Sequence, residues 1–173
     1  MRITKENVVI YGAGKTWSAA ILIEMRDQHG FNINSRWIDF DEVLKNPDDT
    51  FPDSMHKDKA FLQSIWDHGC KEDCRACDVG IMVCTPADGE KLSGALVELG
   101  HVTGEDKPWY ILGTCASVEP VGHSDRAWKA QKVVHHWPEM TNPLDGFNRV
   151  LTHYRRNYRD QWFNRNIYRP LHS

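Results

Sequence analysis

The residues of this chain best suited to chemistry lie in an apolar, helix-like run that holds a single acid. The run reads Ser93-Gly94-Ala95-Leu96-Val97-Glu98-Leu99-Gly100-His101. A carboxylate in apolar surroundings is costly unless it faces water, a partner or a polar cavity. In a cavity beside the end of a strand, Glu98 would act as a nucleophile or a general base. The alternative is a solvated position on the outer face of a helix.

A glycine turn ends the first apolar run of the chain. Val8-Val9-Ile10-Tyr11 is followed by Gly12-Ala13-Gly14. Glycine has no Cβ, so the backbone of this turn can approach a sugar or a base. The turn completes neither common phosphate motif. Val9 stands where a phosphate loop needs glycine, and Trp17 stands where a dinucleotide fingerprint needs its third glycine.

Apolar runs and helical patterns alternate along the chain. Strands are expected at 8–11, 31–40, 79–84, 109–113 and 131–137, and helices at 15–29, 55–76, 92–103 and 144–158. This alternation implies right-handed crossovers and a parallel sheet. We therefore expect an α/β fold, a Rossmann-like (flavodoxin-like) doubly wound sheet of five parallel strands with helices on both faces. Its ligand crevice would lie at the carboxyl ends of the strands, where the turn at 12–14 and the turn before Glu98 both fall.

The order of these motifs resembles the nucleoside 2-deoxyribosyltransferase family and its deoxynucleoside 5′-monophosphate N-hydrolase relatives. Ile10-Tyr11-Gly12-Ala13-Gly14 is similar to the turn after the family's first strand. Gly94 to Gly100 matches the Gly-x-x-x-Glu-Leu-Gly segment that supplies the family's nucleophile. Ser35-Arg36-Trp37-Ile38, Lys107-Pro108 and Asp78 at the start of the third strand are also typical of members.

The resemblance implies cleavage or transfer at the N-glycosidic bond of a deoxynucleoside or deoxynucleotide. Glu98 would stabilise an oxocarbenium-like state and trap the sugar covalently. A second acid must protonate the leaving base, and the candidates are Asp78, Asp73 and Asp88, with Asp78 as the first choice. The residues expected to bind substrate are Gly12, Ala13, Gly14, Arg36, Trp37, Asp73, Asp88, Ser93 and Gly94. No metal ion or cofactor is expected.

Each of these assignments has a structural alternative. Asp78 would cap a neighbouring element, Asp73 would lie on a wet helix face, and Asp88-Gly89 would be an ordinary turn. Arg36 would reach a phosphate or hold Glu98, or would be a surface arginine. Trp37 would stack on a base or pack in the core.

Two departures from the family pattern support a different function. Leu92 and Cys70 stand where the transferases carry aspartates. The alternative to an enzyme is therefore a catalytically inactive nucleotide-binding module of the same fold. A third possibility is an interaction protein whose C-terminal residues dock a partner.

Charge and length divide the chain unevenly. Residues 149–173 hold six arginines and one acid, a net charge of +5, so residues 1–148 carry −8 of the overall −3. We expect one domain over 1–158 and an Arg- and aromatic-rich tail over 159–173. The overall charge gives no case for polymeric nucleic acid, and no apolar run is long enough for a membrane span. The family resemblance implies a homo-oligomer.

Five cysteines without a secretion signal indicate a reducing cytoplasm. Cys70, Cys74 and Cys77 share one face of a helix, preceded by His68. Structural zinc sites seldom draw all their ligands from one helix, so we expect a buried stripe in place of a metal site. His135 and His136 are likewise expected to pack on opposite faces of a strand.

Overall fold

Four parallel strands form the sheet in the computed structural model, which describes residues 1–15, 17–40, 60, 63, 66–85, 93–115, 118 and 132–168. The strands are β1 (Ile10–Ala13), β2 (Val79–Val83), β3 (Trp109–Leu112) and β4 (Val134–Trp137), in the spatial order β1-β2-β3-β4. All three neighbouring pairs are parallel. The α/β class and the parallel sheet agree with the sequence prediction.

The fifth strand, predicted at 31–40, is not formed. Ile33 makes a single parallel bridge to Ile10, and Arg36–Asp39 forms a short 3₁₀ helix, η1. Side chains take over the hydrogen bonds that a longer strand would make. The Gly12 amide donates to the Ser35 hydroxyl at 2.6 Å, and the Arg36 amide donates to the Asp73 carboxylate at 2.9 Å. The pairing with β1 therefore ends after one bridge.

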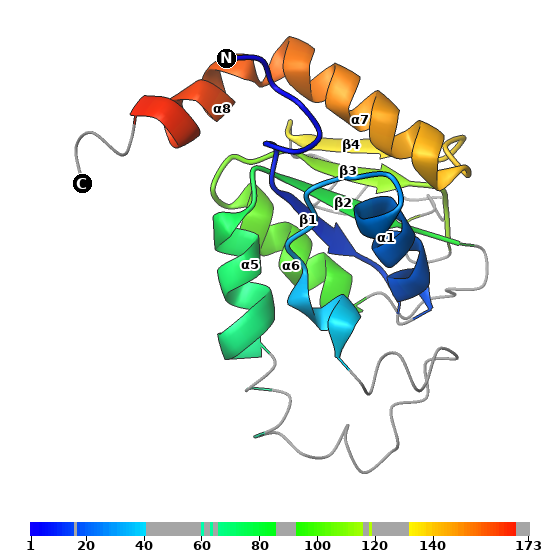
Figure 1. Ribbon diagram of the computed structural model, residues 1–173. Helices are drawn as coiled ribbons and strands as arrows, with labels where there is room; N and C mark the ends of the chain where they lie inside the picture. The colour runs from blue at the N-terminus through cyan, green and yellow to red at the C-terminus, as the bar shows by residue number, and fades with distance from the viewer. Residues whose placement is uncertain are drawn as a thin grey trace.

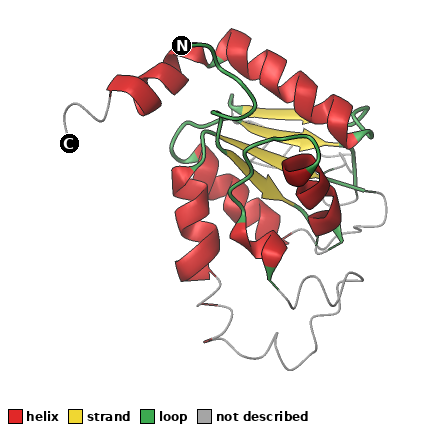
Figure 2. Ribbon diagram, viewed as in Figure 1, coloured by secondary structure: helices red, strands yellow, loops and turns green. Residues whose placement is uncertain are grey.

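Helices cover both faces of the sheet, as Figures 1 and 2 show. On one face lie α1 (Ser18–Asp27) and α7 (Pro143–Asn157), and on the other lie α5 (Lys71–Ala76) and α6 (Ser93–Thr103). The π-helical turn η2 (Trp66–Cys70) leads into α5. Residues 66–76 are thus the described part of the helix predicted at 55–76, and its first half lies largely outside the described residues.

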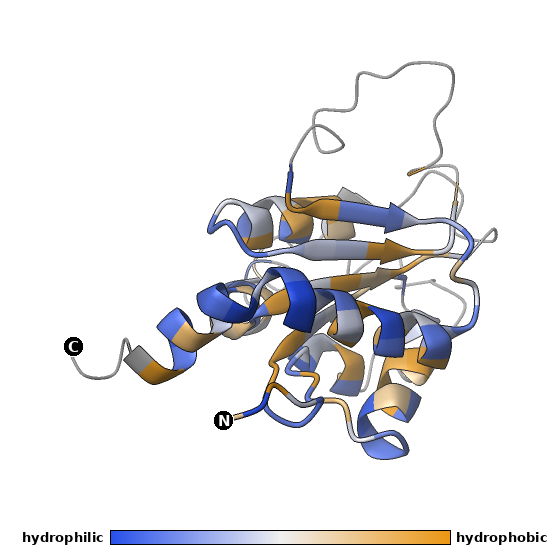
Figure 3. Ribbon diagram, turned by 90° about the horizontal axis from the view of Figure 1, so that it is seen from above, coloured by the Kyte–Doolittle hydropathy of each residue, from blue (hydrophilic) through white to orange (hydrophobic). Residues whose placement is uncertain are grey.

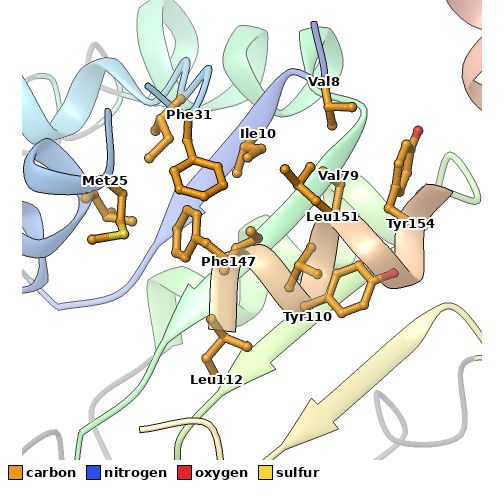
Figure 4. Close-up of a cluster of buried hydrophobic side chains, with 14 of the residues drawn as sticks. Val8, Ile10, Met25, Phe31, Val79, Tyr110, Leu112, Phe147, Leu151 and Tyr154 are labelled. Carbon is orange, nitrogen blue, oxygen red and sulfur yellow. The ribbon is translucent and has the colours of Figure 1, made fainter. Parts of the chain in front are cut away.

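The α1/α7 face is packed by aliphatic and aromatic side chains (Figure 4). Phe31 and Phe147 meet edge to face, with ring centroids 5.1 Å apart. Asn142 caps the start of α7 by accepting from the Asp145 amide, and Pro143 occupies the first turn, where no amide is needed. The helix carries both hydrophobic and hydrophilic residues (Figure 3), as expected when one side packs on a core.

The α5/α6 face holds a second core. Tyr11, Met82 and Ile111 from the strands pack with residues of α5 and α6. Gly80 is required here, because a Cβ would lie 2.1 Å from the buried ring of Trp109. Cys74 and Cys77 lie in this core and all five cysteines are free and buried, which confirms the predicted buried stripe.

The chain continues past α7 into α8 (Arg159–Phe163) and the π-helical turn η5 (Asn164–Tyr168). Trp162 is buried, and its indole NH donates to the Asn7 carbonyl at 3.2 Å. Residues 159–168 of the predicted C-terminal tail are therefore helical, and Trp162 packs this part on the N-terminal segment (Figure 1). Among the described helices, none has the length and apolar character that a membrane crossing requires.

Candidate functional site

Glu98 lies on the flank of α6 that faces α5. Ala95, Leu99 and Val102 are buried and attach α6 to the sheet. Glu98, next to Leu99, is half-buried at the border of this contact. The Glu98 carboxylate is therefore not on a fully solvated helix face, which was the alternative prediction.

Burial raises the pKa of Glu98 to about 7. Hydrogen bonding from Tyr11 and then from Cys70 acts in the opposite direction and lowers the pKa. Desolvation disfavours the charged form of a carboxyl group, whereas donors that bind the charged form stabilise it. Near pH 7 the group is therefore divided between acid and carboxylate.

Tyr11 brings its hydroxyl to Glu98 from the sheet. The hydroxyl is buried and has no hydrogen-bond partner of good geometry among the described residues, yet it is close enough to lower the pKa of Glu98. Burial, and then the charge of Glu98, raise the pKa of Tyr11 well above its ordinary value. Tyr11 therefore stays protonated and is available as a donor toward the carboxylate.

Two thiols from the start of α5 complete the surroundings of Glu98. Burial, and then the charge of Glu98, raise the pKa of Cys70 to about 12, and the same causes raise the pKa of Cys74. Both sulfurs are thus kept as thiols, which are weak donors and poor nucleophiles. Within the ranges that the structure describes, no group of three or more His, Cys, Asp or Glu could hold a metal ion.

The predicted turn at 12–14 is largely part of β1, because Gly12 and Ala13 pair with β2 as the last residues of that strand and only Gly14 follows it. The contacts of Gly12 come from η1 and the residue before it. The Gly12 amide donates to Ser35 and the Gly12 carbonyl accepts from the Trp37 indole at 2.8 Å. Both backbone groups are thus already used, so the amide of Gly12 is not free to meet a sugar. A Cβ on Gly12 would lie 2.8 Å from Leu22, and one on Gly14 would lie 3.0 Å from the Val83 carbonyl. Close packing of α1 and β2 therefore explains both glycines.

Ala13 and Trp37 lie beside this turn. Ala13 is buried in the α5/α6 core. Trp37 is only partly buried, and it packs against the cores of both faces. It is the one aromatic ring among the predicted binding residues, and its bond to the Gly12 carbonyl places it at the carboxyl end of β1.

Arg36 and Asp73 bind each other. The Arg36 Nε donates to the Asp73 carboxylate at 2.9 Å, as the Arg36 amide does, and Arg36 also pairs with Glu72 at 2.8 Å. Asp73 is buried, so it does not lie on a solvated helix face, and its carboxylate is not free to bind a substrate. This contact ties η1 to α5, and half of the Arg36 side chain remains exposed.

Asp78 lies at the amino end of β2, away from the groups around Glu98. Its carboxylate accepts from the Val9 amide at 2.9 Å and from Asn166 at 3.0 Å, and the Arg165 Nε lies 3.6 Å away. The structure does not bring Asp78 to Glu98. The start of a strand is at the opposite edge from the ligand crevice, so the predicted position itself counted against a catalytic role.

Three predicted binding positions remain, namely Asp88, Ser93 and Gly94. Asp88 lies outside the described residues. Ser93 begins α6, but its side chain also lies outside them. Gly94 is exposed, and a Cβ there would meet nothing within 4 Å.

The sequence alone did not reveal the partners of Glu98. Tyr11 was predicted to lie in a buried strand, and Cys70 to lie in a buried stripe at a position where the resembling transferases carry an aspartate. A polar tip on a strand residue next to the glycine turn was the available signal for Tyr11. His101, about one turn after Glu98 on α6, has its ring 5.0 Å from that of Trp66.

A cavity larger than the one at the α7–α8 junction lies at another place in the described structure. It measures about 820 Å³ and is lined by Glu105, Asp106, Lys107, Gln161, Asn164 and Arg165. Its buried cation is already paired, because the Lys107 Nζ donates to the Cys74 and Arg75 carbonyls and lies 2.6 Å from Glu105. Volume alone therefore does not make it the reactive site.

Comparison with protein-family models, curated proteins and solved structures finds no match. What the Glu98 site does must therefore be inferred from its own residues.

Proposed function

We propose that this protein cleaves or transfers the N-glycosidic bond of a deoxynucleoside or deoxynucleotide, with Glu98 as the nucleophile. One observation carries the proposal: a half-buried carboxyl group of raised pKa, about 7, stands beside a buried tyrosine hydroxyl that makes no hydrogen bond of good geometry among the described residues. Such perturbed groups concentrate at functional sites. The motif resemblance from Ile10 to Gly100 points to the same residue.

The chemistry proceeds in two displacements. A Glu98 oxygen bonds to C1′ as the bond from C1′ to the base nitrogen breaks, and the electron pair leaves with the base, which takes up a proton. Water or a second base then attacks C1′ and frees the carboxylate. Tyr11 and Cys70 stand next to the carboxylate, and in this proposal they orient it as donors.

Of the three acids predicted as proton donor to the leaving base, two are bound to other groups in the structure. Asp78 is held by Val9 and Asn166, and Asp73 is held by Arg36. Asp88 therefore stays as the prediction for this step. The homo-oligomer expected from the family resemblance also stays a prediction.

A second candidate is the catalytically inactive nucleotide-binding module. Cys70 favours it, because this position is a thiol with a pKa of about 12 where the resembling transferases carry an aspartate. A thiol of that pKa is a weak acid and would protonate a leaving base poorly.

Release of free base separates the two functions. Deoxynucleosides and deoxynucleoside 5′-monophosphates are incubated with the wild type, Glu98→Gln and Glu24→Gln, and the products are separated by chromatography. The half-exposed Glu24 of α1 serves as the matched control. We expect release by the wild type and Glu24→Gln, and its loss in Glu98→Gln. Nucleotide binding by the wild type with no release, with or without an acceptor base, would establish the binding module instead.

A further inference from the structure

A small basic cavity lies at the other end of the molecule, where the chain passes from α7 to α8. It measures about 220 Å³ and is lined by Met1, Arg2, Ile3, Arg155, Arg159 and Phe163. Figure 1 shows the N-terminus against the junction of α7 and α8. We infer that this cavity binds the phosphate group of a small phosphomonoester, at a site separate from Glu98.

The three arginines come from separate segments and have no acidic partner. Among the residues that the structure describes, no carboxylate lies within ion-pair distance of Arg2, Arg155 or Arg159, whereas Arg26 and Arg149 are both paired. The charge of these guanidinium groups is therefore available to an anion.

Glu6 is an acid whose charge interacts with Arg155, but it does not form an ion pair with it. Glu6 is exposed, and its pKa is lowered first by its hydrogen bond to Thr4, with smaller contributions from Lys5 and Arg155. The charges of Glu6 and Arg155 thus attract each other, but the two side chains do not form an ion pair.

Two of the guanidinium groups are already oriented. The Arg155 Nε donates to the Ile3 carbonyl at 2.8 Å, and the Arg159 guanidinium lies 5.5 Å from the centroid of the Phe163 ring. Each contact uses only part of a group that has five N–H donors. The remaining donors present the fork that matches a phosphate.

The end of α7 explains only part of this charge. Basic residues in a last helical turn interact favourably with the helix dipole, which accounts for Arg155 and its neighbour Arg156. Arg2 and Arg159 lie outside that turn. The volume of the cavity is below that of typical ligand pockets, so it fits one phosphate with a small substituent against Ile3 and Phe163. A nucleic-acid strand would need a longer basic surface than the −3 chain offers.

Inorganic phosphate is the probe that tests the site. Its titration at constant ionic strength is followed by amide NMR shifts in the wild type, Arg2→Gln, Arg159→Gln and Arg156→Gln. Arg156 is on the same turn as Arg155 but does not line the cavity, so it is the matched control. We expect saturable shifts at residues 1–3 and 155–163, about tenfold weaker binding in Arg2→Gln and Arg159→Gln, and unchanged binding in Arg156→Gln.

Equal weakening in all three variants, or no saturable shift in a folded protein, would overturn the inference. A short single-stranded oligonucleotide is the second probe, and tighter binding of it than of a phosphomonoester would also overturn it. Glu98→Gln should keep the phosphate site whether or not the wild type releases base. The failure of the proposed reaction and the failure of this site are thus distinguishable.

Discussion

Glu98 is divided between its neutral and charged forms near pH 7, because burial raises its pKa to about 7. Only the carboxylate is a nucleophile. We therefore expect kcat/KM for base release to rise about tenfold per pH unit below pH 6 and to level off above about pH 8. Initial rates between pH 4 and pH 9 measure this profile. A rate that falls from pH 5 upward would mean that Glu98 acts as an acid.

Tyr11 supplies the matched test of that profile. Its hydroxyl lowers the pKa of Glu98, so Tyr11→Phe should move the rising limb to higher pH and reduce kcat/KM about tenfold at pH 6. Tyr110→Phe removes a hydroxyl that binds His153 and is the control, with no shift of the limb expected. An unchanged limb in Tyr11→Phe would show that the hydroxyl does not reach the carboxylate.

Glu98 also makes the stability of the fold depend on pH. The folded pKa of about 7 is above the unfolded value of 4.5, so the native protein binds more protons between these values. The free energy of unfolding should therefore fall as pH rises from about 4.5 to 7, by at most about 3 kcal/mol from this group. Glu98→Gln should remove that loss and be the more stable protein at pH 8. Urea unfolding at pH 5 and pH 8 measures the difference, and equal pH dependence in both proteins would contradict it.

At the scale of the element, the contact between β2 and β3 depends on one missing side chain. A Cβ at Gly80 would lie 2.1 Å from the buried Trp109 ring. Gly80→Ala should lower the free energy of unfolding by about 2 kcal/mol or more, because the ring cannot move within a packed core. Gly100→Ala is the control, since nothing lies within 4 Å of its Cβ, and it should stabilise α6 by about 0.5–1 kcal/mol. Denaturant unfolding of both variants checks the pair, and equal effects would refute the packing argument.

The segment 31–40, which follows α1, shows how contacts with neighbouring elements decide the local structure. Its sequence alternates as a strand does, but Ser35 and Asp73 take the bonds that would extend the ladder. One of these partners is close in sequence and the other is 37 residues away from Arg36. Local pattern could not show that α5 would supply an acceptor there.

At the scale of the whole molecule, the C-terminal helices close the amino end of the sheet. Trp162 is buried against the N-terminal segment, and Asn166 with Arg165 faces the buried Asp78. Trp162→Ala should therefore destabilise the protein by about 3 kcal/mol, the cost of a lost core aromatic. Phe163→Ala, which removes the neighbouring half-buried ring, should cost less. Thermal unfolding of both variants tests this, and a small effect at Trp162 would show a loosely attached tail.

The sequence by itself determined the α/β class, the parallel strands and the place of Glu98 in the apolar helix α6, because buried runs, helical periods and a lone carboxylate are local signals. It also predicted the buried cysteine stripe. Tertiary structure decided the rest. The fifth strand stopped at Ile33 because distant side chains took its bonds. Asp78 binds Asn166, and Tyr11 and Cys70 lie next to Glu98. The packing of the helices on the sheet decides which polar groups become neighbours. Residues far apart in the chain come into contact only when the core forms, so a local sequence pattern does not predict these contacts.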